Sequence, residues 1–355
     1  MGKRPFLLWL GSYAACAAPV VWLRPRWLTP LALAGAIVWS ASVAGPLAVL
    51  AALLVLALGL PGLAVLITAM SLTIALPIHY PLLYWIVVPA AVFLLRRRMR
   101  LPSWPNLSRM EAAAAALLIF ALLSNWLMAL KPEISADGLA MHLVIPARVA
   151  LDHRWSFDVA RFTWAVMPMG GDWAYTAAYL MGGEAAARIL NFGLLAWMAF
   201  SILRLLARWA TLTRALLLTA VFVSSPLVTM ATGSMFVENF WGALVVGALS
   251  AVFDRRFLIA ALLLGAAVAS KLGALPFAAA ILVLLAVETL REPGFPWVRT
   301  VAASFAIFFV LAAIPYGTAW AVTGNPVFPF LNTTFQSPLY DTSVPFQDNR
   351  YRTPA

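Results

Sequence analysis

Apolar residues fill most of this chain in long stretches that short polar connections interrupt. A stretch of about 20 apolar residues is long enough for a helix to cross the hydrocarbon core of a membrane. Gly45-Pro46 is expected to break the longest stretch, which is too long for one upright span. The stretches predict helices near residues 5–23, 28–60, 62–79, 81–95, 110–130, 185–208, 213–231, 235–253, 257–270, 273–290 and 300–322. We therefore expect an all-α, polytopic membrane helical bundle of about ten or eleven transmembrane helices.

The composition agrees with a membrane location. Hydrophobic residues make up 64% of the 355 residues and charged residues only 10%, with a mean hydropathy of +0.92. Soluble domains are about 45–50% apolar. The net charge of +11 does not indicate nucleic-acid binding, because Lys and Arg lie in short clusters beside the apolar stretches. The single cysteine, Cys16, excludes a disulfide framework and a metal site built on paired cysteines.

Arginine-rich connections recur along the chain from residue 96 onward. They are residues 96–109, the group Arg204, Arg208 and Arg214, residues 254–256 and residues 291–299. The positive-inside rule places these four connections in the cytoplasm and the intervening ones outside. Many of the thirteen carboxylates then lie on the external side: Glu133, Asp137, Asp152, Asp158, Asp172, Glu184, Glu238, Asp341 and Asp348.

The chain divides into three parts in this scheme. Residues 1–100 hold N-terminal transmembrane helices whose topology the pattern leaves open, and residues 101–322 form a membrane core. Residues 323–355 form an external tail rich in Pro and aromatic residues. The external loop 131–184 within the core is long enough to be functional or disordered. Apolar residues at three- and four-residue spacing predict that it is structured, with short helices lying at the membrane surface.

An ordered series of motifs resembles the bacterial integral-membrane glycosyltransferases of the GT-C superfamily. The motifs are "ADGLAMHLVIPARVALDHRW" after a membrane helix, "MPMGGDWAYTAAYLMGGEAAARILNFG", "ASKLGAL" and "GNPVFPFLNTTF", and the resemblance covers about residues 110–340. It implies an active site on the external face of the cytoplasmic (inner) membrane and a polyprenyl-phosphate-linked sugar as donor. A hexosyl or pentosyl group would pass to a glycan, lipid or protein acceptor, with no nucleic-acid partner. Family members often continue with further helices, so a short form or a fragment is one expectation.

The resemblance implies that Asp137 acts as the catalytic base. The family often shows paired acids, whereas Asp137 is followed by Gly138 and the nearest acid, Glu133, lies four residues upstream. A carboxylate at the membrane boundary suits the removal of a proton from an acceptor hydroxyl. The alternative is that Asp137 caps the helix that begins at Gly138.

Lys271 is the first candidate for binding the donor phosphate. It lies between two apolar stretches, where a cation is costly unless it faces a cavity or the interface. An ammonium group suits a phosphate, and the alternative is that the side chain reaches lipid headgroups. His142 and Arg161 are further candidates for the phosphate, and Arg188 is an additional one.

The remaining candidates concern the sugar and the metal. Glu238 and Asn239 are expected to line the sugar site, although Glu238 could instead pair with Lys271. Trp164 and Asn325 complete the predicted substrate-binding set, and Asn325 equally suits a turn. The sequence contains no clear metal-ligand motif, so a divalent metal cofactor is left open.

Other classes of protein remain as alternatives. A transporter or lipid flippase should carry ionisable residues near mid-bilayer and repeated halves, whereas here the acids gather toward one face. An O-antigen ligase-like transferase would also use an external loop and bound phosphates. Walker, Rossmann, Gly-x-Ser-x-Gly and HExxH patterns do not occur, so a soluble nucleotide-sugar site is not supported. The sequence leaves the sugar, the acceptor and the stereochemical outcome open.

Overall fold

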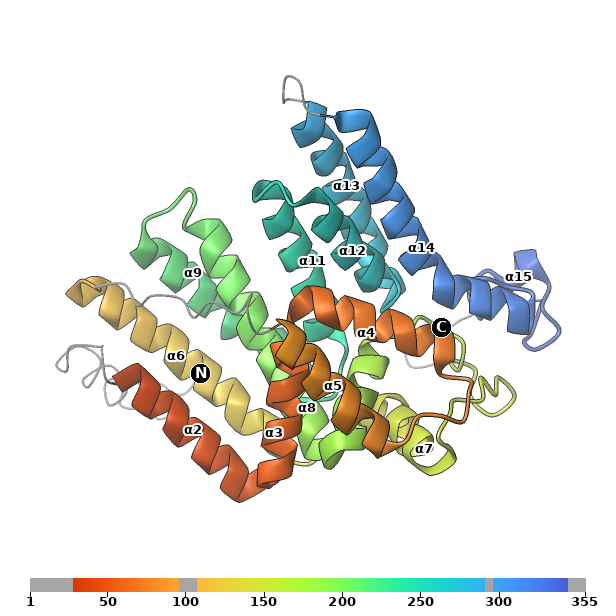
Figure 1. Cartoon of the computed structure of the whole chain (residues 1–355), viewed down its shortest axis with the longest axis horizontal. Helices are drawn as coiled ribbons and strands as arrows, with labels where there is room; N and C mark the ends of the chain where they lie inside the picture. The colour runs from red at the N-terminus through yellow and green to blue at the C-terminus, as the bar shows by residue number, and fades with distance from the viewer. Residues whose placement is uncertain (1–27, 96–106, 291–295, 344–355) are drawn as a thin grey trace, which may run out of the picture.

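The computed structural model describes residues 28–95, 107–290 and 296–343, and within these ranges all regular structure is helical (Figure 1). The predicted helix 5–23 lies outside them. The helices are α2 Leu28–Ala44, α3 Pro46–Ala57, α4 Gly59–Thr73, α5 Pro81–Leu95, α6 Arg109–Ala129, η2 Gly138–His142, α7 Val144–Asp152, α8 Gly170–Leu206, α9 Leu212–Val223, α10 Pro226–Gly233, α11 Glu238–Phe253, α12 Phe257–Val268, η3 Leu272–Ala274, α13 Leu275–Leu290, α14 Trp297–Thr323 and α15 Asn332–Phe335.

Several of these helices are long and apolar enough to cross a membrane. Among the described residues they are α6, α8 and α14, or five spans if each of two bent pairs counts as one. The bent pairs are α3 with α4, at 99°, and α9 with α10, at 59°. The expectation of a helical membrane protein is confirmed at this level. The count of ten or eleven spans stays a prediction, because α5, α11, α12 and α13 are apolar but shorter.

The break predicted at Gly45-Pro46 is confirmed. Gly45 has a φ of 89°, which glycine adopts without steric cost, and Pro46 opens α3, where its missing N–H is not needed. A second break follows at Gly59, whose φ is 69°. The stretch 28–60 therefore forms two helices, and the chain turns sharply into α4.

Helix α8 is the central element of the fold. It packs most extensively against α3 and α11, and small residues bring the backbones together. A Cβ added at Gly182 would come within 2.8 Å of the Cα of Ala48 in α3. Residues 182 and 183 have non-helical backbone angles that kink α8. Residues 170–178, in the segment before this kink, are all buried against the rest of the protein, and the expected position of this segment at the membrane surface stays a prediction.

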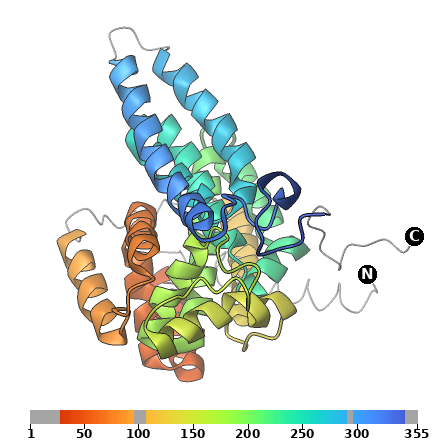
Figure 2. The same cartoon turned by 90° about the vertical axis from the view of Figure 1, so that its right-hand side faces the viewer.

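The two ends of the helix array differ in character. Arg208 and Arg204, near the C-terminal end of α8, both contact Asp254 in the next Arg-rich connection. The opposite end holds the N-terminal ends of α8 and α11 and the C-terminal ends of α12 and α14. In Figures 1 and 2 the α13–α14 pair extends furthest from the α2–α3 region. The Arg-rich connections described by the structure and the predicted site thus lie at opposite ends of these helices.

Candidate functional site

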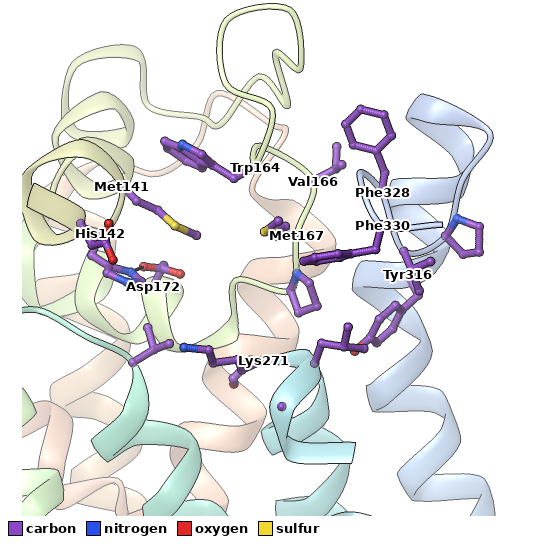
Figure 3. Close-up of a pocket in the computed structure, with 18 of the residues that line it drawn as sticks. Met141, His142, Trp164, Val166, Met167, Asp172, Lys271, Tyr316, Phe328 and Phe330 are labelled. Carbon is purple, nitrogen blue, oxygen red and sulfur yellow. Dashed lines mark hydrogen bonds and ion pairs between the residues drawn. The ribbon is translucent and has the colours of Figure 1, made fainter. Parts of the chain in front are cut away.

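A cavity of about 690 Å³ opens at the end of the array away from the Arg-rich connections. Its volume lies within the range of about 300–1,000 Å³ that is usual for small-molecule sites. Figure 3 shows its wall, with Met141, Trp164 and Met167 on one side and Tyr316, Phe328 and Phe330 on the other. Four predicted site residues line it: Asp137, His142, Trp164 and Lys271. They come from separate parts of the chain, so the fold brings them together.

His142 and Asp172 form a buried pair in this cavity. His142 ends the short helix η2, and Asp172 lies in the first turn of α8. The distance between His142 Nδ1 and Asp172 Oδ1 is 2.6 Å, and their side chains are 9% and 1% exposed. The N-terminal end of a helix favours a carboxylate, so the first turn of α8 is a suitable position for Asp172. The ring of Phe236 lies edge-on to the imidazole, with 6.0 Å between ring centroids.

The surroundings of His142 change its protonation. Burial alone lowers the pKa of the imidazole, but the charge and hydrogen bond of Asp172 act in the opposite direction. The charge of Glu238 also raises the pKa, while that of Lys271 lowers it. The net result is a pKa above the ordinary value for histidine. His142 therefore holds its proton to a higher pH than a free histidine does.

Lys271 lies in extended backbone between α12 and η3, and thus between two apolar helical segments. Its side chain is 44% exposed and lines the cavity. Its ammonium group also pairs with Glu238, the first residue of α11. The alternative interpretation of Glu238 as an ionic partner is thus confirmed. Glu238 does not itself line the cavity.

Asp137 lines the cavity and is half-buried. It occupies the position before η2, but its side chain makes no capping hydrogen bond. The hydroxyl of Ser135 accepts from the backbone N–H of Gly138 instead, at 3.1 Å. The interpretation of Asp137 as a helix cap is therefore wrong.

Glu133 belongs to a second buried ion pair. Its carboxylate lies 3.1 Å from Arg188 Nη1, and both side chains are almost fully buried. Arg188 also donates to three backbone carbonyls, those of Met128, Ala129 and Gly233. Arg188 does not line this cavity, and its donors are engaged by Glu133 and these carbonyls, so the structure gives the interpretation of Arg188 as a phosphate ligand no support.

Asn239 belongs to a buried amide network rather than to the cavity wall. Its Nδ2 donates to Asn191 Oδ1 at 3.0 Å and to Thr232 Oγ1 at 2.9 Å. Asn191 in turn donates to the carbonyls of Ala231 and Ser234. Asn239 thus does not line the cavity, and its amide stabilises the α10–α11 turn; its predicted contact with the sugar stays a prediction.

The three remaining candidates differ in whether they line the cavity. Asn325 is buried and builds a turn, accepting from the N–H of Val327 at 3.0 Å and donating to the carbonyl of Phe330 at 2.9 Å. The turn interpretation is confirmed, and Asn325 supports the cavity wall without lining it. Arg161 is exposed outside the cavity, with its guanidinium carbon 5.4 Å from the Phe162 ring centroid. Trp164 lines the cavity and stacks on Phe162.

Asp172 is the functional candidate that the sequence did not single out. It appears there only as one of many external acids, in the run "GGDW". A Gly-rich run that leads into a helix is a signal that an acid near it sits at a helix N-terminus. The partner, His142, lies 30 residues away, and only the fold shows that the two meet.

No group of three His, Cys, Asp or Glu side chains in the described ranges is placed to hold a metal ion. Comparisons of the chain with protein-family models, with curated proteins and with solved structures gave no match.

Proposed function

We propose that the protein is a membrane glycosyltransferase that binds a polyprenyl-phosphate-linked sugar in this cavity. It transfers the sugar to an acceptor at the external face of the cytoplasmic membrane. The observation that carries the proposal is one cavity that combines an apolar, aromatic wall with Lys271 and the His142–Asp172 pair. An apolar lipid chain, a phosphate and a sugar ring each have a matching surface there.

Lys271 is the proposed ligand of the donor phosphate. A charged hydrogen bond from an ammonium to a phosphate oxygen is stronger than a neutral one, and the partly exposed side chain can reach the cavity. Glu238 holds the ammonium while no phosphate is bound. Trp164, stacked on Phe162, offers an aromatic face to the sugar ring.

The transfer step needs little more than positioning and a proton acceptor. The acceptor hydroxyl oxygen forms a bond to the anomeric carbon, and the bond from that carbon to the phosphate oxygen breaks. The electron pair of the broken bond remains on the phosphate, whose charge Lys271 stabilises. The hydroxyl proton passes to a basic side chain on the cavity wall, and both Asp137 and His142 are placed for this.

The test is sugar transfer in membranes that contain the protein, with a panel of labelled polyprenyl-phosphate sugars. We expect transfer by the wild type. Lys271→Gln should raise KM for the donor at least about tenfold, because a charged contact to phosphate is worth roughly 1.5–3 kcal/mol. Lys131→Gln is the matched control, since Lys131 is exposed and lies outside this cavity.

A flippase would give a different result in the same membranes. It would move the labelled lipid between leaflets without forming a new glycoside. Lipid movement without product from any donor would contradict the transferase proposal. Equal KM values for Lys271→Gln and Lys131→Gln would contradict the assignment of the phosphate site.

A further inference from the structure

The His142–Asp172 pair has the geometry of a proton-transfer dyad. Asp172 accepts from Nδ1 of His142 at 2.6 Å, so the imidazole orientation and tautomer are fixed. Within the described parts of the chain no hydrogen bond involves Nε2 of His142, and the ring lines the cavity. Asp172 itself is only 1% exposed. Of the two groups, the imidazole is therefore the one that presents a nitrogen to a bound molecule.

We propose that His142, positioned by Asp172, accepts the proton of the acceptor hydroxyl during sugar transfer. This assignment rests on the function proposed above and replaces the sequence-based expectation that Asp137 is the base. Asp137 then contributes to binding the acceptor at the cavity wall.

The fold holds the side chain of His142 in a packed position. His142 is buried between η2 and α8, and the ring of Phe236 packs against its imidazole. Asp137 is half-buried at the start of η2. A base must stay in a fixed position near the reacting hydroxyl, which favours the packed imidazole.

The charges around His142 suit a base that works near neutral pH. Asp172 faces it from α8, Glu238 acts on it from α11, and Lys271 acts from the α12–η3 junction. Asp137 lies on the same wall, before η2. The two carboxylates of Asp172 and Glu238 outweigh burial and Lys271, so the pKa of His142 lies above the ordinary value for histidine. General-base catalysis is most effective when the pKa lies near the working pH.

The proposed step conserves atoms and electrons. Nε2 of neutral His142 takes the hydroxyl proton as the oxygen forms its bond to the anomeric carbon. The bond from that carbon to the phosphate oxygen breaks, and its electrons leave with the phosphate. The imidazolium is stabilised by its hydrogen bond to the carboxylate of Asp172, and it then releases its proton to water.

The first test is the pH dependence of kcat for transfer. For the wild type, kcat should rise with pH through the pKa of His142 and then level off. His142→Gln should lower the plateau by about 10²–10⁴-fold and remove this step, because the base is absent. Asp172→Asn should lower the plateau of kcat and move the step to lower pH. Asp172→Glu should recover part of the plateau and return the step part of the way toward its pH in the wild type.

Asp152→Asn is the matched control for Asp172→Asn, since Asp152 is exposed at the end of α7 and outside the cavity. Its pH profile should match that of the wild type. Asp137→Asn should raise KM for the acceptor more than it lowers kcat. Loss of the pH step in Asp137→Asn, with the step retained in His142→Gln, would overturn the assignment.

The second test observes the dyad without any reaction. The chain has only three histidines, His79, His142 and His153, so histidine-selective ¹⁵N labelling gives few signals. His142 should show a downfield Nδ1–H proton and a raised pKa, and both should disappear in Asp172→Asn. Absence of that signal in the wild type would overturn the dyad. An intact signal in a protein that transfers no sugar would overturn the transferase proposal, and with it the role of His142 as its base.

Discussion

Arg188 is a buried residue whose charge serves the structure. It pairs with Glu133 and donates to carbonyls at the C-terminal ends of α6 and α10. Arg188→Met should destabilise the protein by about 3–5 kcal/mol, because it leaves the Glu133 carboxylate buried without a cationic partner. Denaturant unfolding in detergent measures this. The double variant Glu133→Gln with Arg188→Met should recover part of the loss, and equal stability of the wild type and Arg188→Met would contradict the prediction.

His142 should make stability depend on pH. Its pKa is raised in the folded protein above about 6.5, the value expected in the unfolded chain, so the folded state binds the proton more tightly. The stabilisation is complete below pH about 6.5 and is lost as pH rises through the raised pKa. The difference in unfolding free energy between wild type and His142→Gln should shrink over this range. A difference that stays constant or grows as pH rises above about 6.5 would contradict this prediction.

Single residues show what the sequence can and cannot reveal about the site. Asp137, His142 and Lys271 were identifiable because ionisable groups are scarce in this chain and costly beside apolar stretches. The buried network of Asn239 was not foreseen, because a polar residue near a helix end suits a buried amide network as well as a ligand site. Asp172 was missed because its role depends on a contact across 30 residues.

At the level of elements, Gly183 determines the kink in α8. Its φ of 72° and ψ of −168° are accessible almost only to glycine, and a Cβ there would meet no atom within 4 Å. Gly183→Ala should therefore destabilise the protein by about 1–3 kcal/mol through backbone strain alone. Thermal unfolding in detergent measures the effect.

Gly317 in α14 provides the control for this prediction. A Cβ there also meets no atom within 4 Å, and its backbone is not in the left-handed region. Gly317→Ala should be neutral or stabilise by up to about 1 kcal/mol, because alanine favours a helix. Similar destabilisation by Gly183→Ala and Gly317→Ala would show that the kink geometry is not the cause.

Two glycine-containing sites show which helix boundaries could be predicted from the sequence. Gly45-Pro46 is a local signal, and the helices stop and restart there. Gly182 and Gly183 were taken as the end of the external loop, whereas α8 begins at Gly170 and continues past them. The spacing of apolar residues did not show that Gly182 and Gly183 lie within a helix. The segment before the kink is buried on most of its surface and shows no polar face.

For the whole molecule, the separation of the Arg-rich connections from the cavity gives a test of topology. Cys16 is the single cysteine, so Cys16→Ser provides a background for single labelling sites. Ser156→Cys reports the loop that carries Trp164, and Trp209→Cys reports the connection beside Arg208; both positions are exposed. A membrane-impermeant maleimide added to intact cells should label only Ser156→Cys. Labelling of both positions from outside would contradict the orientation.

The overall architecture was predictable only in outline. Composition and apolar stretches indicated an all-helical membrane chain, because burying backbone in lipid requires helices or closed barrels. The arrangement of the helices was not predictable, since it depends on close contacts such as that of Gly193 with Leu56, which brings α8 against α3. Such contacts join residues that lie far apart along the chain.

The kink in α8 also bears on which part of this long helix crosses the membrane. Helix α8 has 37 residues, which would be about 55 Å if straight, against roughly 30 Å of hydrocarbon. The part after Gly183 alone is about 35 Å long and suffices to span the bilayer. In the proposed orientation, the segment before the kink, with Asp172, lies outside the span formed by the later part of α8. The proposed transferase would then act on the polar head of a lipid while the tail stayed in the bilayer.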